Sequence, residues 1–114
     1  MTYQEISTMI DSIGIPYAYY QFPEGTGQDC PFICFFFQMG NDFIADGVNY
    51  QKIRTLSIEL YTDVKDFALE ETVEQVLNSH GLVYSREETY LDSEKMNMVT
   101  YSTDVLITKE NDNG

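Results

Sequence analysis

The segment from Tyr50 to Ser79 constrains the fold most, because it joins a long strand to an acidic amphipathic helix. From Tyr50 to Thr62 apolar and polar residues alternate, which is the pattern of a strand with one buried face. Asp63 is a favourable N-cap, and a helix is expected from about Val64 to Ser79. Its buried side is predicted to consist of Leu69, Val73, Val76 and Leu77.

The rest of the chain supplies one more helix and four more strands. The helix is expected at Tyr3–Ile13, ending at Gly14, and the strands at Tyr17–Phe22, Phe32–Met39, Leu82–Leu91 and Met96–Thr108. The order α-β-β-β-α-β-β predicts an α+β fold, a mostly antiparallel sheet with two helices packed on one face. A chain of 114 residues predicts one domain, with a frayed tail at 109–114.

Two strands have unusual patterns. Phe32–Met39 is apolar on both faces, which predicts a place inside the sheet and cover on each side. A domain of this size cannot easily supply the second cover, so this strand favours self-association. In the long strand Ile53 breaks the alternation, which would fit a bulge near Arg54.

The charge of the chain excludes several classes of partner. Nineteen acidic residues oppose six basic ones, for a net charge of -13. So acidic a surface repels nucleic-acid phosphates and anionic membranes, since binding to either depends on Lys and Arg. The longest wholly apolar run, Phe32 to Phe37, is far shorter than the ~20 residues of a membrane helix. The N-terminus also lacks the pattern of a secretory signal, so we expect a cytoplasmic protein.

Residues that could carry catalysis or hold a metal are few. His80 is the only histidine and is expected to belong to the cap of the second helix. Cys30 and Cys34 would lie roughly 13 Å apart in an extended segment, too far for a disulfide. Neighbouring acids such as Glu87 and Glu88 point to opposite faces of a strand and cannot form a convergent acid/base pair. We therefore expect buried free thiols and no catalytic, cofactor or metal site.

Two surfaces are candidates for binding a partner. The connection from Gly40 to Asn49 is polar except for Phe43 and Ile44, and Asp46 with Gly47 predicts its turn. Phe43, Ile44 and Asp46 either fold back onto the sheet edge or meet a neighbouring subunit. The second candidate is an acidic ridge on the second helix, formed at i+3 and i+4 spacing by Asp63, Asp66, Glu70 and Glu74.

Two long segments carry a resemblance to a known family. Ile58 to Leu77, with the pattern ELYTDxKD, and Ser85 to Val105, with ExYxxSEK, resemble small prophage proteins of Gram-positive bacteria. The pieces IGIPYAYYQFPEG and DCPFICFFF resemble the N-terminal half of the same proteins. These proteins lie among head-tail joining and tail genes. They are similar to the tail terminator, or tail-completion, proteins of long-tailed phages such as lambda.

The resemblance implies a non-enzymatic structural protein of the virion. Its partners would be further copies of itself in a ring, such as a hexamer on the tail. The tail tube protein and the head-tail connector proteins would be further partners. It would assemble in the host cytoplasm and end in the virion tail. An acidic lining would keep DNA from sticking inside such a ring. The alternative is a monomeric acidic module that mimics DNA or inhibits a DNA-binding protein, with the acidic ridge as its binding surface.

Overall fold

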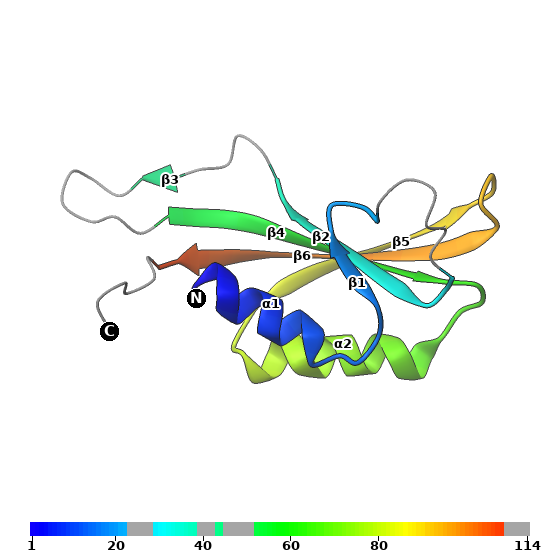
Figure 1. Cartoon of the computed structure of the whole chain (residues 1–114), viewed down its shortest axis with the longest axis horizontal. Helices are drawn as coiled ribbons and strands as arrows, with labels where there is room; N and C mark the ends of the chain where they lie inside the picture. Colours follow the sequence, from blue (N-terminus) through cyan, green and yellow to red (C-terminus); the bar gives the residue numbers. More distant parts are fainter. Residues whose placement is uncertain (23–28, 39–42, 45–51, 109–114) are drawn as a thin grey trace.

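The computed structural model describes residues 1–22, 29–38, 43–44 and 52–108, with only the backbone at 43, 44 and 52. Two helices lie against one face of a twisted sheet (Figure 1). The elements in chain order are α1 (Tyr3–Asp11), β1 (Tyr17–Tyr19), β2 (Phe32–Phe37), β3 (Phe43–Ile44), β4 (Lys52–Thr62), α2 (Phe67–Ser79), β5 (Tyr84–Leu91) and β6 (Met96–Ile107). The predicted α+β class is confirmed, and the two-residue strand β3 is an addition to the predicted order.

The strands run in the order β1-β2-β4-β6-β5, and β3 pairs with β4 beside this path. Every pairing is antiparallel except that of β1 with β2. β2 has neighbours on both sides, so its predicted place inside the sheet is confirmed. Its outer neighbour, β1, contributes only three residues.

No bulge interrupts β4. Its register with β6 is continuous from the pair Lys52–Ile107 to the pair Thr62–Asn97, so the bulge expected near Arg54 is wrong. Ile53 points to the face away from the helices and is 41% exposed. The break in the alternation is therefore an apolar residue on the open face, and it leaves the strand geometry unchanged.

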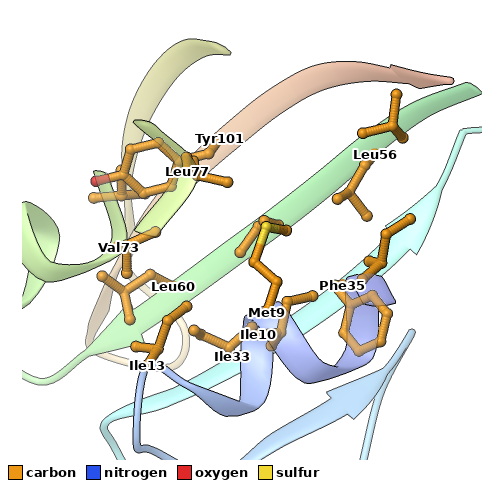
Figure 2. Close-up of a cluster of buried hydrophobic side chains, with 14 of the residues drawn as sticks. Met9, Ile10, Ile13, Ile33, Phe35, Leu56, Leu60, Val73, Leu77 and Tyr101 are labelled. Carbon is orange, nitrogen blue, oxygen red and sulfur yellow. The ribbon is translucent and has the colours of Figure 1, made fainter. Parts of the chain in front are cut away.

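Apolar side chains of both helices form the core. Of the four predicted on α2, Val73 and Leu77 are fully buried, and Leu69 and Val76 are partly buried against the core. Met9 and Ile10 of α1, with Val73 and Leu77 of α2, pack over Leu56, Leu60 and Tyr101 of the sheet (Figure 2). All seven side chains are at most 1% exposed. Burying one aliphatic side chain of this size contributes about 1.5–3 kcal/mol, so these contacts hold both helices on the sheet.

Local capping sets where α1 begins and ends. The Thr2 side chain accepts a hydrogen bond from the Glu5 amide at 3.1 Å, and the Glu5 carboxylate accepts one from the Thr2 amide at 2.7 Å. This reciprocal pair satisfies two amides that the first helical turn leaves free. Gly14, at φ +91°, turns the chain after the helix in a conformation that favours glycine.

The start of α2 differs from the prediction. The helix begins at Phe67, and the Asp66 carboxylate accepts a hydrogen bond from the Leu69 amide at 3.0 Å. Asp66 is therefore the N-cap, and Asp63 lies in the connection from β4. At the other end Gly81 has φ +72°, and the Leu82 amide donates to the Leu77 carbonyl at 3.1 Å. Gly81 therefore ends α2 in the conformation that Gly14 adopts after α1.

Candidate functional site

The structure treats the two predicted binding surfaces differently, the first of which is the connection from Gly40 to Asn49. The backbone of Phe43 and Ile44 forms β3, paired with Ile53 and Lys52 of β4. This segment therefore folds back onto the sheet edge, while the side chains of both residues, and all of Asp46, lie outside the described residues. Contact of the connection with a neighbouring subunit stays a prediction.

The acidic ridge does not form one helical surface. Asp63 precedes the helix and Asp66 caps it, because α2 begins three residues later than expected. Glu70 is only 3% exposed and faces the sheet, and Glu74 contacts Tyr101 and Arg86. The ridge is therefore a misinterpretation: equal spacing along the sequence placed buried and exposed acids together.

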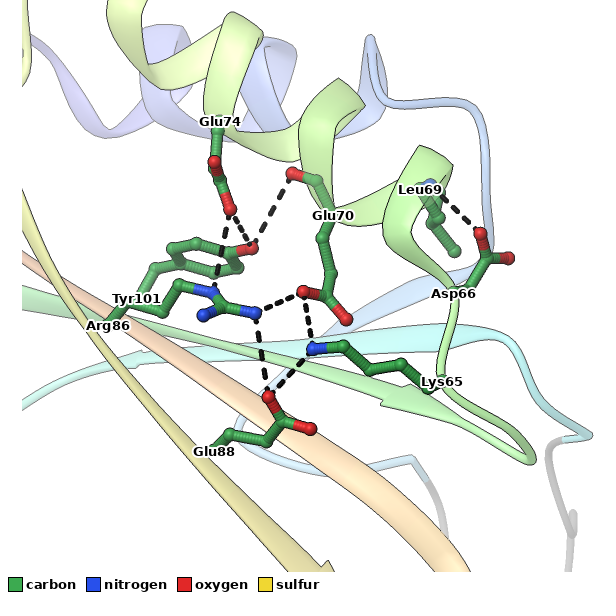
Figure 3. A network of polar contacts seen from close by, with 8 residues as sticks. All are labelled: Lys65, Asp66, Leu69, Glu70, Glu74, Arg86, Glu88 and Tyr101. Atoms are coloured by element: carbon green, nitrogen blue, oxygen red, sulfur yellow. Dashed lines mark hydrogen bonds and ion pairs between the residues drawn. The ribbon is translucent and has the colours of Figure 1, made fainter.

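Glu70 lies in a charged cluster that joins α2 to the sheet (Figure 3). Its Oε1 accepts from the Lys65 ammonium at 2.8 Å and from the Arg86 guanidinium of β5. Lys65 also donates to Glu88 at 2.7 Å, so one lysine links the helix entry with both carboxylates. These charge-assisted contacts are stronger than neutral hydrogen bonds and hold the first turns of α2 beside β5.

Tyr101 extends the cluster into the core. Its hydroxyl donates to the Glu74 carboxylate at 2.9 Å, and the Arg86 Nε lies 3.5 Å from the same carboxylate oxygen. Among the described residues the second oxygen of Glu70 has no hydrogen-bond partner, although it is fully buried. A buried oxygen without a partner costs stability. The positive charges of Lys65 and Arg86, which neutralise Glu70, offset this cost.

The ionisation of the cluster follows from these contacts. Hydrogen bonding to Lys65 lowers the pKa of Glu88 below its usual value. Burial, then the bond to Glu74, raises the pKa of the Tyr101 phenol well above 10. Glu88 is thus ionised and Tyr101 is protonated at neutral pH. These protonation states maintain the ion pairs and hydrogen bonds of the cluster, which hold α2 against the sheet.

The sequence contains a signal for this cluster. In β5, Arg86 and Glu88 lie on the same side of the strand as Tyr84, which packs against the core. An arginine on the buried face of a strand requires an acidic partner. Glu70 and Glu74, one turn apart on the facing helix, meet that need.

The open face of the sheet carries aromatic side chains at one end. Phe32 stacks on Tyr61 with 4.7 Å between ring centroids, and Phe22 meets Phe32 edge-on at 5.4 Å. Tyr20 lies against Phe36 at 5.9 Å. The segment after β1 therefore supplies part of the second cover that the apolar strand β2 was predicted to need. No helix of the described ranges covers this face (Figure 1).

Other candidate groups are placed as follows. Cys30 and Cys34 are free, as predicted, with Cys34 buried and Cys30 half-buried. His80 is the C-cap residue of α2, and its Nδ1 lies 2.9 Å from the Val76 carbonyl. Within the described ranges no three His, Cys, Asp or Glu side chains are grouped to hold a metal ion. None of the helices described is long and apolar enough to span a membrane.

Comparison with known proteins bears on the fold. No protein-family model and no curated protein matches the sequence. Among solved structures, the chain is similar to one in a structure described as the virion of a native gene transfer agent particle. The two share 14% sequence identity and a TM-score of 0.54, over 91% of this chain and 90% of the other. This likeness shows that the α+β fold, over almost its full length, also occurs in a chain of that particle.

Proposed function

We propose that the protein is a non-enzymatic structural component of a phage or prophage virion, with a tail-terminator or tail-completion role. The observation that carries this proposal is the likeness of fold to a chain in a gene transfer agent virion, which extends over nine-tenths of both chains. In this role several copies close the head-proximal end of the tail as a ring. The tail tube protein and the head-tail connector proteins are its further partners.

The charge distribution supports a path for DNA through such a ring. Exposed acids lie on α2 and along the β5–β6 hairpin, including Glu71, Glu87, Asp92 and Glu94. Acidic walls repel DNA phosphates, so DNA would move past them without adhering. The DNA-mimic hypothesis relied on the acidic ridge, and the burial of Glu70 removes that surface.

Deleting the gene from its phage or prophage tests the role. We expect normal heads, and tails that fail to join them or vary in length, because the tube lacks its closing ring. Electron microscopy of induced lysates measures both, and expression of the wild-type protein in trans should restore infectious particles. Particles with normal, joined tails in the deletion strain would contradict the proposal.

The connection from Gly40 to Asn49 is proposed to contact a neighbouring subunit or a tail partner. Changing Phe43 and Ile44 together to serine is expected to lower the titre of complemented particles at least tenfold, since apolar contacts at an interface are lost. The melting temperature should change little, because the two-residue strand β3 lies off the main strand path and contributes little to the core. Val83→Ser is the control, since Val83 is 87% exposed and lies outside the connection. An unchanged titre would show that the connection is not an interface.

A further inference from the structure

An aromatic pocket lies between α1 and the sheet. It has a volume of about 330 Å³, and its walls include Tyr3, Ser7, Tyr19, Phe37 and Arg54. Tyr3 meets Phe37 edge-on at 5.3 Å between centroids, and Tyr19 lies 6.2 Å from Phe37. This volume is at the lower end of the range for ligand pockets, and an aromatic lining with a few polar groups is typical of them.

The wall residues favour an aromatic side chain accompanied by an acid. Three rings offer edges and faces on which a further ring can pack. Arg54, which already interacts within its own chain, adds a positive charge to the pocket wall and so favours an acidic ligand. Tyr3 and Tyr19 are 43% and 56% exposed, so the mouth of the pocket is open to solvent.

A complementary surface lies at the opposite end of the folded molecule. Val64 and Phe67 are 75% and 73% exposed, which is unusual for large apolar side chains. Asp63 is exposed beside them, and its carboxylate also contacts the Cys30 thiol of its own chain. We refer to Asp63, Val64 and Phe67 as the α2 knob. The Lys65 ammonium lies 4.9 Å from the centroid of the Phe67 ring, a cation–π contact that helps to hold the ring in place.

A chain cannot insert its own knob into its own pocket. Arg54 and Thr62 are eight residues apart on one strand, roughly 26 Å at ~3.3 Å per residue. Figure 1 shows the start of α2 and the first turns of α1 at opposite ends of the helical layer. The two surfaces can meet only between copies.

We propose that the α2 knob of one copy occupies the aromatic pocket of the next. Phe67 packs among the pocket rings, and Asp63 approaches Arg54. Two different surfaces joined in this way form a heterologous contact, which closes into a ring when the rotation between copies permits. The inference rests on the proposed ring function and names the pair of surfaces that would build it.

Mixing two complementary variants tests the contact. Phe67→Asp disables the knob, and Ser7→Trp fills the pocket while leaving the knob intact. In sedimentation experiments over a concentration series we expect the wild type to associate and each variant alone to associate at least about 30-fold more weakly. An equimolar mixture should form 1:1 heterodimers and nothing larger, since only one knob and one pocket remain functional. Retained association of either folded variant would overturn the proposal.

Matched controls separate binding from folding. Val83→Asp places the same charge at another exposed apolar position, and Thr8→Trp places the same ring on the exposed side of α1. Both should associate like the wild type. Circular dichroism confirms folding, and Tyr19→Ala replaces Ser7→Trp if that variant does not fold, because it removes a half-exposed pocket wall.

Photo-crosslinking in particles separates this inference from the proposed function. With a benzophenone side chain at position 67, we expect crosslinks to peptides of residues 1–12 or 52–55 of a neighbouring copy. If the protein is present at the tail end but these crosslinks are absent, the proposed function stands and the proposed interface is refuted. Crosslinks to a different tail protein would lead to the same conclusion. If the protein associates through the α2 knob in solution but is absent from particles, the contact is supported and the virion role is refuted. A protein that is monomeric in solution and absent from particles overturns both.

Discussion

Replacing Val73 with aspartate is expected to unfold the protein. Val73 is completely buried, on the side of α2 that packs against the sheet. The change places a carboxylate without a partner in the core. Such substitutions cost on the order of 4 kcal/mol or more, a large part of the stability of an ordinary domain. Thermal unfolding followed by circular dichroism should show no cooperative transition, or one that is much lower than in the wild type.

Thr72→Asp is the matched control for this change. Thr72 is the preceding residue of the same helix and is exposed, so a carboxylate there remains in water. Its melting temperature should stay within a few degrees of the wild type. A wild-type melting temperature for Val73→Asp would show that this side of α2 does not face the sheet.

Replacing Arg86 with methionine is expected to cost about 2–4 kcal/mol, the second large effect. The Glu70 side chain is 4% exposed and has only Lys65 and Arg86 as cationic partners among the described residues. Without the guanidinium its buried charge is balanced by one partly exposed lysine. Urea unfolding at neutral pH measures the loss, and Lys95→Met removes a positive charge from the exposed β5–β6 turn as the control.

A double variant distinguishes a lost ion pair from lost packing. Adding Glu70→Leu to Arg86→Met removes the buried carboxylate, so we expect part of the stability to return. If the double variant is less stable than Arg86→Met alone, the packing of the arginine stem would be the main contribution. A single variant within 0.5 kcal/mol of the wild type would show that the cluster contributes little.

The periodic spacing of apolar residues was enough to identify most of the helices and strands and their buried faces. The spacing of Ile6, Met9 and Ile10 on α1, and the alternation of Val99 and Tyr101 on β6, each place side chains that are at most 1% exposed. These predictions succeed because a helix or strand repeats its faces at a fixed interval, whatever it packs against. The glycine that follows each helix is an equally local sequence signal, because the residue at that position adopts a left-handed conformation.

Tertiary structure decided the features on which the proposals depend. Glu70 follows the same spacing as the exposed acids around it, yet it is buried because it faces the sheet, where it pairs with Arg86 of β5. The aromatic pocket combines Tyr3 of α1, Phe37 of β2 and Arg54 of β4, residues far apart in the chain. Local spacing sets which residues share a face, while only the pairing of distant elements sets which charges become partners and where a hollow remains.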